Sequence, residues 1–373
     1  MNINSYIRYY GNKTFEENPF NDVDALILAE FSYVNMELLF PDGCDQVCLK
    51  NIDIKRLKKD VFYGSVDASY NKTLLKNMSQ SIRYKDLIVT EIENRFSKEE
   101  INQFYAFTII LPNGDLYISF RGTDITLIGW KENFLITYQT TMLAQIQSVS
   151  YVERVLDKYP NSKFYMGGHS KGGNLAFYAA LHMENEYADR MINAYSFDGP
   201  GFREGISQLE TYESRIDRLI KYRTYNDVIG SFFNNMEKYK TVHSTGLLFG
   251  GHDTFFWQIN PVNGKFLYAK DTSYWSKMYS KRFMNWLDTL SFDDRALATD
   301  ALFEIFKENN TVIDLAKNFG KNIATSKKAL SRYSKDEQKR LKTILKTLFK
   351  YMMAFTNVSE KEPKKIESPE EKQ

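Results

Sequence analysis

One stretch constrains the fold more than any other, residues 163–180, which read KFYMGGHSKGGNLAFYAA. Apolar and small residues at 164–167 follow the turn signal Tyr-Pro-Asn at 159–161, and this pattern predicts a short buried strand. The pentapeptide Gly-His-Ser-Lys-Gly comes next, and strong helix formers follow it at 174–180. A strand, a G-x-S-x-G turn and a helix in this order are the context of a nucleophile elbow.

The residue types of this turn fit the chemistry of an activated serine. Ser170 would stand at the tip of a tight, strained turn, where side chains at Gly168 and Gly172 would collide with the strand and the helix. The backbone N–H of Lys171, at the helix start, could then donate to a developing oxyanion. The alternative is a serine that only caps the helix; the strand and helix around the pentapeptide favour the elbow.

Composition sets broad limits on the class of protein. The chain has 373 residues, enough for one large domain or two smaller ones, and 43% of them are hydrophobic. Its formal net charge of +2 argues neither for nor against nucleic acid. The basic residues are scattered until the C-terminus and nothing demands an anionic partner, so we expect no nucleic-acid partner. The N-terminus lacks a signal-peptide pattern and no run of 18 apolar residues occurs, which predicts a cytoplasmic protein.

Nothing in the sequence indicates a metal or a cofactor. The two cysteines, Cys44 and Cys48, lie four positions apart, and no second Cys or His pair is spaced to complete a zinc cluster. We expect reduced structural thiols, no metal site and no cofactor.

Strand and helix patterns alternate through the first 273 residues. A capped helix is expected at 25–37, turns and short helices at 41–100, and further helices at 128–138, 140–158 and 202–216. Buried strands are expected at 104–111, 116–120, 164–167, 191–197, 219–225 and 241–249. This alternation predicts an α/β protein with a mostly parallel central sheet and helices on both faces.

The remainder of the chain has a different character. Only helical patterns are legible from about residue 274, and the charged tail at 359–373 shows no apolar periodicity. We therefore expect three parts, an α/β domain at 1–273 with an N-terminal helical arm, a helical region at 274–358 packed on it, and a disordered tail at 359–373.

A serine nucleophile needs a base, and the chain offers only four histidines. His169 lies inside the elbow, His182 lies on the helix after it, and His243 falls in the middle of a predicted strand. His252 lies in a glycine-rich loop after that strand, where such a loop can carry an imidazole over the sheet edge. We therefore expect His252 to be the base.

Two aspartates are candidates for the acid that orients this base. Asp227 directly follows the predicted strand at 219–225, between Ser170 and His252 in sequence, and is the preferred candidate. Asp198 also ends a strand, but Gly-Pro-Gly follows it, which favours a turn-stabilising role. Asp198 is kept as the alternative acid.

The second oxyanion donor should come from the turn after an earlier strand. Phe-Arg-Gly-Thr at 120–123 follows the predicted strand at 116–120, and Gly122 permits a sharp turn there. The N–H of Thr123 could then aim at the oxyanion beside that of Lys171.

Four motifs in order, ISFRGTD, GGHSKGGNLA, YNDVIG and GHDTFFW, resemble those of class 3 (fungal-type) lipases. The closer resemblance is to the Mbeg-like bacterial hydrolases, and it spans about residues 20–260. It implies an α/β-hydrolase fold without cofactor, with Ser170 as nucleophile, Asp227 as acid and His252 as base. It also implies an oxyanion hole shaped by Thr123 and Lys171. The helical last third lies outside the lipase pattern.

These features predict a serine hydrolase that cleaves a carboxylic ester or thioester of a small molecule or lipid through an acyl-enzyme. One alternative is a phospholipid acylhydrolase at the membrane surface. A helix at 335–355 would carry Lys342, Lys346 and Lys350 on one face for peripheral membrane contact. A second alternative is a non-catalytic binding module that keeps the fold. The sequence does not indicate an oligomeric state.

Overall fold

A computed structural model describes most of the chain. The described residues are 1–41, 43–53, 68–97, 99–123, 131, 134–202, 209–226, 228–233, 238–246, 248–306 and 330–353.

A single mixed sheet organises the molecule, and its strands lie side by side in the order of the sequence. Pairing is antiparallel from β1 to β4, parallel from β4 to β8, and antiparallel again between β8 and β9. The strands are β1 (Gln46–Cys48), β2 (Ile88–Ser97), β3 (Asn102–Ile110), β4 (Leu116–Phe120), β5 (Phe164–His169), β6 (Met191–Phe197), β7 (Leu219–Thr224), β8 (Lys240–Val242) and β9 (Tyr268–Ala269). The predicted parallel sheet is therefore its central part, β4 to β8.

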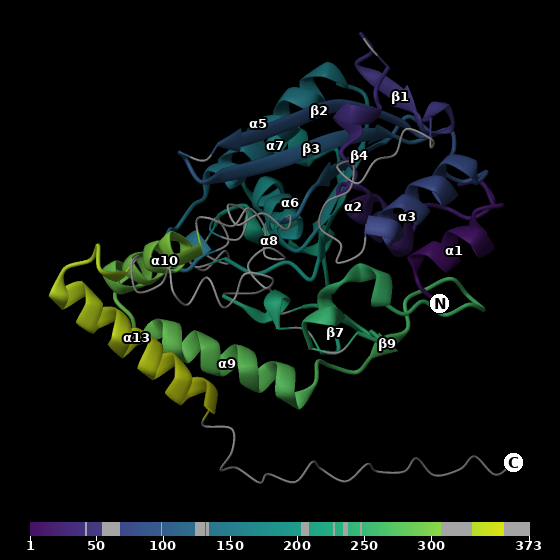
Figure 1. Cartoon of the computed structure of the whole chain (residues 1–373). Helices are drawn as coiled ribbons and strands as arrows, with labels where there is room; N and C mark the ends of the chain where they lie inside the picture. Colours follow the sequence, from purple (N-terminus) through teal and green to yellow (C-terminus); the bar gives the residue numbers. More distant parts are fainter. Residues whose placement is uncertain are drawn as a thin grey trace, which may run out of the picture.

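Helices cover both faces of this sheet (Figure 1). On one face, α5 (Leu143–Lys158) and α6 (Lys171–His182) pack on alternate residues of the central strands, such as Ile118 and Met166. On the other face, α1 (Ile3–Tyr10), α2 (Asp22–Phe31) and α3 (Ala68–Gln80) cover residues such as Tyr117. Strands buried on both sides need apolar residues throughout, which explains their nearly continuous apolar sequence. This architecture is an α/β-hydrolase fold.

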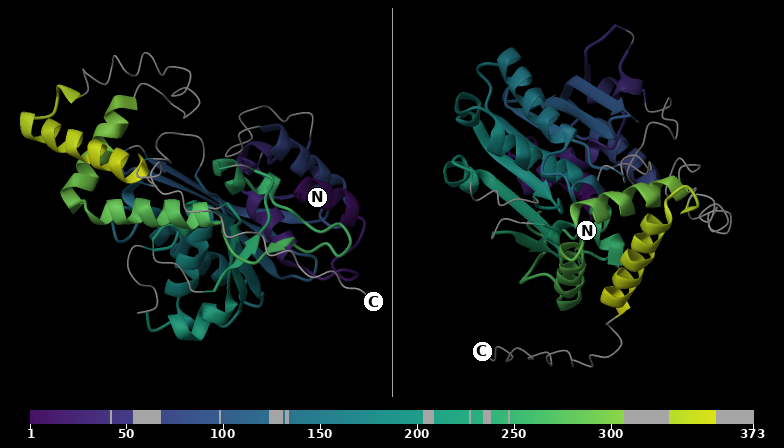
Figure 2. Two further views of the ribbon diagram at one scale, coloured as in Figure 1. Left: turned by 90° about the horizontal axis from the view of Figure 1, so that it is seen from below. Right: turned by 90° about the vertical axis from the view of Figure 1, so that its left-hand side faces the viewer.

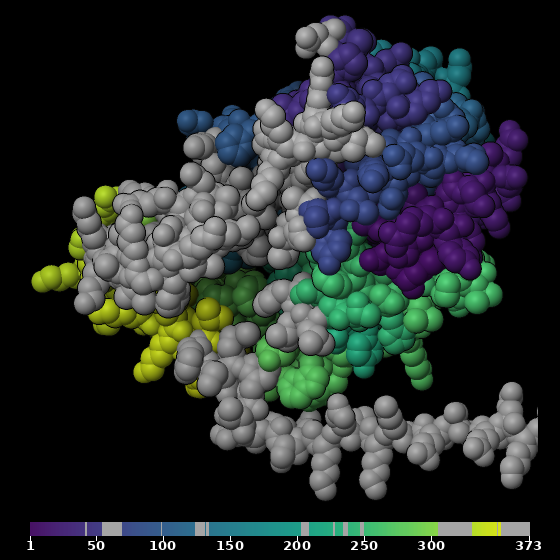
Figure 3. All heavy atoms as spheres, turned by 45° about the vertical axis from the view of Figure 1, so that its right-hand side comes forward, coloured from purple at the N-terminus to yellow at the C-terminus, as the bar shows by residue number. Residues whose placement is uncertain are grey.

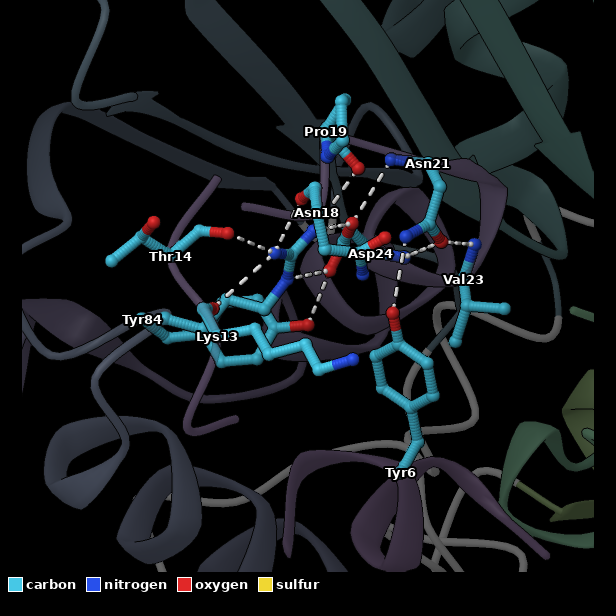
Figure 4. A network of polar contacts seen from close by, with 10 residues as sticks. Tyr6, Lys13, Thr14, Asn18, Pro19, Asn21, Val23, Asp24 and Tyr84 are labelled. Carbon is cyan, nitrogen blue, oxygen red and sulfur yellow. Dashed lines mark hydrogen bonds and ion pairs between the residues drawn. The ribbon is translucent and has the colours of Figure 1, made fainter. Parts of the chain in front are cut away.

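A buried ion pair joins the N-terminal arm to the body of the protein (Figure 4). Arg83 binds the Asp24 carboxylate at 2.5 Å, and both side chains are fully buried. The same guanidinium donates to the carbonyl oxygens of Thr14 and Asn18 at 3.1 and 2.7 Å. Because each charge has its partner, the pair can fix the path of residues 13–24 without an unsatisfied group.

The first residue is held by the segment after the predicted base. The Met1 ammonium donates to the carbonyl of Ile259 at 2.8 Å, and the Ile259 N–H donates to the Met1 carbonyl at 2.7 Å. Figure 3 shows the purple N-terminal residues in contact with the green residues of this part of the chain. The N-terminal arm thus lies against the segment between β8 and β9.

Three helices follow the sheet and lie together at the side away from the N-terminus (Figure 2). They are α9 (Tyr274–Asp288), α10 (Phe292–Phe306) and α13 (Lys335–Met353). Leu341 and Ile344 of α13 are buried against α9 and α10, whereas Leu345 is 61% exposed. Part of the apolar side of α13 is therefore used inside the protein. Of the helices in the described ranges, none combines the length and the hydropathy needed to cross a bilayer.

Several predicted elements differ from the structure. Residues 41–100 contain β2, a ten-residue strand that was not expected because its charged residues hide the alternation and a bulge lies between Thr90 and Glu93. The helix expected at 25–37 is α2, which begins earlier, after its Asn21 cap, ends at Phe31, and is buried on all sides rather than on one face. The strand expected at 241–249 ends at Val242, and a 3₁₀ turn, Leu248–His252, follows instead. Residues 359–373, the expected disordered tail, lie outside the described residues.

Candidate active site

Ser170 occupies the connection between β5 and α6 in a strained conformation. Its φ of 56° and ψ of −127° place a β-carbon-bearing residue in a region that L-amino acids rarely adopt. The Ser170 N–H donates to the carbonyl of Phe197 at 2.9 Å, and its carbonyl accepts from the N–H of Gly173 at 2.9 Å. These bonds hold the strained turn in place, which is the geometry of a nucleophile elbow.

Close approach of backbone explains the two glycines that flank the serine. A β-carbon at Gly168 would overlap the backbone of Gly172 and the carbonyl oxygen of Phe120. A β-carbon at Gly172 would overlap the same carbonyl of Phe120. Only glycine lets α6 start this close to the end of β4, as expected from the sequence.

His252 and Asp198 form a hydrogen-bonded pair at the same edge of the sheet. The Nδ1 of His252 lies 2.7 Å from Oδ2 of Asp198, whose side chain is fully buried, whereas that of His252 is 22% exposed. A carboxylate can only accept, so Nδ1–H donates, and in the neutral form of the ring the lone pair is on Nε2. This is the tautomer that a general base needs.

The backbone around Asp198 holds its carboxylate toward His252. Asp198 follows β6 with a positive φ of 54°, and its N–H donates to the carbonyl of Tyr222 at 2.8 Å. The side-chain amide of Asn174, one turn after Ser170, donates to the carbonyls of Pro200 and Gly201 at 3.2 and 3.0 Å. The turn that carries Asp198 is therefore tied directly to α6.

His169 joins the elbow to the loop of His252. Its Nε2 donates to the carbonyl of His252 at 2.8 Å, because that carbonyl can only accept. Its Nδ1 must then accept from the hydroxyl of Tyr33, at 3.1 Å. Burial, together with the neighbouring His252, holds the pKa of His169 well below the ordinary value. A neutral ring with a fixed tautomer thus anchors the backbone of His252 to His169, the residue before Ser170.

Lys171 and Thr123, the predicted oxyanion donors, both lie close to the connection between β5 and α6. Lys171 is the first residue of α6, and its side chain is buried, with Nζ donating to the carbonyl of Gln103 at 2.6 Å. Thr123 follows Gly122, where a β-carbon would overlap the hydroxyl of Tyr33 and the carbonyl oxygen of His169. The turn at 121–123 therefore runs directly against the end of β5.

A hollow of about 120 Å³ opens at Ser170. Ser170, Lys171 and Asn174 line one side of it. Apart from Thr137, the rest of the lining is apolar and comes largely from the segment before α5 and from residues on and near α9, namely Phe134, Ile136, Met142, Pro200, Ile229, Phe232, Phe233 and Phe283. A serine at the edge of an apolar hollow, with a histidine–aspartate pair at the same sheet edge, can attack an apolar acyl compound.

Residues 78–304 match the Mbeg1-like family, a match that covers more than half of the chain. The chain belongs to the Mbeg1-like family. No curated protein matches this Mbeg1-like sequence.

Solved structures similar to this Mbeg1-like protein include several lipases. The M37 lipase is 15% identical, covering 58% of this chain and 70% of its own, with a TM-score of 0.36. The Lip2 lipase of Yarrowia lipolytica is 10% identical, covering 68% of this chain and 96% of its own, with a TM-score of 0.34. The Rhizomucor miehei lipase in its propeptide complex is 14% identical, covering 65% and 68%, with a TM-score of 0.35. Likenesses of this extent carry no conclusion about activity.

The structure of the Mbeg1-like chain brings together most, but not all, of the predicted site. His252 is hydrogen-bonded to Asp198, the alternative acid, and Ser170 lies at the same sheet edge, at the end of the neighbouring strand β5. Asp227, the preferred acid, lies outside the described residues. His243 is exposed beside Tyr225, and His182 is exposed and stacks on Tyr178, so neither joins the pair.

Sequence reasoning missed three contributions. The roles of His169 and Asn174 depend on contacts with residues 83 and 26 positions away, which no local pattern reports. The one available signal was an asparagine in a helix of otherwise small and apolar residues. The apolar hollow draws on residues near α9, far from any motif.

Proposed function

We propose that this protein is a serine hydrolase that cleaves a carboxylic ester or thioester through a triad of Ser170, His252 and Asp198. The observation that carries the proposal is the 2.7 Å hydrogen bond between Asp198 and His252, beside a serine in a strained elbow. This combination has a direct catalytic use, and a strained serine that only capped a helix would have no need of the pair.

The proposed reaction has two steps. His252 Nε2 takes the proton of Ser170 while Oγ bonds to the acyl carbon, and the tetrahedral oxyanion accepts from the N–H groups of Lys171 and Thr123. The bond to the alcohol or thiol then breaks, and this leaving group takes the proton from His252. Water, deprotonated by His252, then attacks the acyl-enzyme and releases the carboxylic acid and Ser170.

Asp198 has an orienting role in this scheme. Its buried carboxylate keeps the proton of His252 on Nδ1 and stabilises the imidazolium that forms in each step. We propose Asp198 rather than Asp227 for this role because Asp198 is the described carboxylate bonded to that ring. The phospholipid acylhydrolase alternative draws less support, because Leu341 and Ile344 of α13 already pack inside the protein.

Labelling with a fluorophosphonate, read by peptide mass spectrometry, tests the proposal on the full chain. We expect an adduct on Ser170 in the wild type, none in Ser170→Ala, and a strongly reduced rate in His252→Ala. Ser150→Ala, at an exposed serine of α5, is the matched control and should label like the wild type. A folded wild type that takes no adduct would contradict the proposal and support a non-catalytic binding module.

A further inference from the structure

A second hollow lies beside the one at Ser170. It has a volume of about 290 Å³ and lies among the helices α9, α10 and α13. Apolar side chains from all three helices line it, among them Leu287, Ala301, Leu341 and Ile344. Because this lining is mostly apolar, water in the hollow finds few hydrogen-bond partners, and an apolar ligand can replace it favourably.

The two hollows meet at three residues. Phe134, Thr137 and Phe283 line both of them. The ring of Phe283 lies 4.8 Å from Phe232 of the first hollow and 5.6 Å from Trp286 of the second, measured between ring centroids. These three side chains thus form the boundary between the two hollows, and a ligand that passes them enters the second.

The polar side chains that line the second hollow donate hydrogen bonds to backbone carbonyls of the protein. The Arg295 guanidinium donates to the carbonyls of Thr137 and Leu287, at 2.7 and 2.6 Å for its two terminal nitrogens. The hydroxyl of Thr299 donates to the carbonyl of Arg295 at 2.8 Å, and that of Thr137 donates to the carbonyl of Phe134 at 2.6 Å. A sugar or a charged headgroup would lose its water there for little return.

We infer that the second hollow holds the acyl chain of the substrate, so that helices α9, α10 and α13 select for chain length. This inference rests on the proposed function, because the chain must be bonded to the carbonyl that Ser170 attacks. A saturated hydrocarbon needs no hydrogen-bond partner, and apolar cavities stay dry and take up apolar ligands of fitting size. The helical region, outside the four hydrolase motifs, thereby acquires a role in substrate binding.

Chain-length dependence of hydrolysis tests the inference. The full-length protein is assayed with the p-nitrophenyl esters of acetate, octanoate and dodecanoate, as wild type and as Ala301→Phe and Ala298→Leu. Both alanines line the second hollow, so the larger side chains fill it. Ala296→Phe adds the same bulk on α10 at a residue outside the hollow and is the matched control. The readout is the ratio of kcat/KM for long and short esters, which does not depend on the fraction of folded enzyme.

In the wild type we expect kcat/KM to rise with chain length, by up to about fourfold for each methylene that the hollow holds. Ala301→Phe and Ala298→Leu should lower the dodecanoate-to-acetate ratio by about tenfold, the loss of room for about two methylenes. Ala296→Phe should keep the wild-type ratio.

Two outcomes are distinguishable. Cleavage of all three esters with the same ratio in every variant would overturn the inference and leave the proposed function intact; the hollow would then belong to another occupant, such as a segment of this chain. No cleavage of any ester, acetate included, together with no fluorophosphonate adduct on Ser170, would contradict the proposed function itself.

Discussion

The Nε2 of His169 donates to the backbone carbonyl of His252 at 2.8 Å, and the two rings lie 4.5 Å apart. His169 precedes the proposed nucleophile, so one hydrogen bond fixes the loop of the base relative to the elbow. The Tyr33 hydroxyl sets the tautomer that makes this bond possible. We therefore propose His169 as a positioning residue that acts through His252.

Replacing His169 by leucine removes the donor and leaves the carbonyl of His252 unsatisfied. We expect kcat/KM for p-nitrophenyl acetate to fall by about 10- to 100-fold, as for a buried acceptor that loses its partner. His169→Gln can place an amide N–H near the position of Nε2 and should recover part of the rate. If both variants kept the kcat/KM and the melting temperature of the wild type, the bond would have no role in positioning.

Two matched variants identify the acid. Asp198→Asn keeps the size of the side chain but no longer accepts from His252 as a carboxylate, so we expect kcat to fall by about 10⁴-fold. Asp227→Asn should leave kcat close to that of the wild type. Steady-state hydrolysis of p-nitrophenyl acetate measures both. The reverse result would return the role to Asp227 and make the pair of Asp198 and His252 structural.

The elbow was predictable because its information is local. Strand, pentapeptide and helix are contiguous, and the glycines at 168 and 172 have the close contacts expected of them. The hydrogen bond of Asp198 to His252 was not predictable in this way, because Asp-Gly-Pro-Gly at 198–201 is an equally good turn sequence. In the structure Asp198 has the positive φ of such a turn, and its carboxylate also accepts from His252.

The sheet and the helices were predictable to different extents. Strands β4 and β6 have the predicted bounds because their apolar runs end at clear turns. Strand β2 was missed because Glu91, Glu93 and Arg95 break the apolar pattern, and Glu91 has a positive φ of 52° at the bulge. The periodicity of the last helices indicated apolar faces but could not name what those faces enclose, since the partners lie in other elements.

The close approach of Gly172 to the carbonyl of Phe120 gives a third prediction. Gly172→Ala should displace the start of α6 and abolish labelling of Ser170, with a loss of about 1–3 kcal/mol in the free energy of unfolding. Gly250→Ala is the control, because a β-carbon there has no atom within 4 Å although the residue lies near His252. Urea unfolding and fluorophosphonate labelling together report both effects; equal labelling of the two variants would mean that the elbow tolerates a side chain.

Glu30 makes stability depend on pH. It is buried and accepts from the hydroxyl of Thr254 at 2.8 Å, two residues after His252. Burial, with a smaller contribution from Asp253, raises the pKa of Glu30 well above its ordinary 4.5. The native state therefore holds this proton more tightly than the unfolded chain does. The stabilisation is complete below about pH 4.5 and is lost as the pH rises through the raised pKa, with a slope of up to about 1.4 kcal/mol per pH unit.

Glu30→Gln should flatten this loss, because glutamine keeps the acceptor for Thr254 and has no proton to release. Urea unfolding from pH 5 to pH 8 measures the slope for the wild type and the variant. Some slope should remain, since burial also raises the pKa of Asp253. Glu213→Gln, at an exposed residue, should behave as the wild type. Parallel curves for the wild type and Glu30→Gln would contradict the assignment.

The last prediction concerns the ion pair of Arg83 and Asp24. Arg83→Met leaves the Asp24 carboxylate buried without its cation, so we expect a loss of about 3–5 kcal/mol in the free energy of unfolding. Adding Asp24→Asn to this variant removes the unpaired buried charge and should restore part of the lost free energy of unfolding. Lys50→Met, in the exposed ion pair with Asp86, is the control and should change the free energy of unfolding little. Because Asp24 belongs to α2, which packs on β4 and β5 beneath the elbow, Arg83→Met should also slow labelling of Ser170. Unchanged stability in Arg83→Met would mean that the ion pair adds no net stability over an apolar side chain at this position, as for some buried ion pairs.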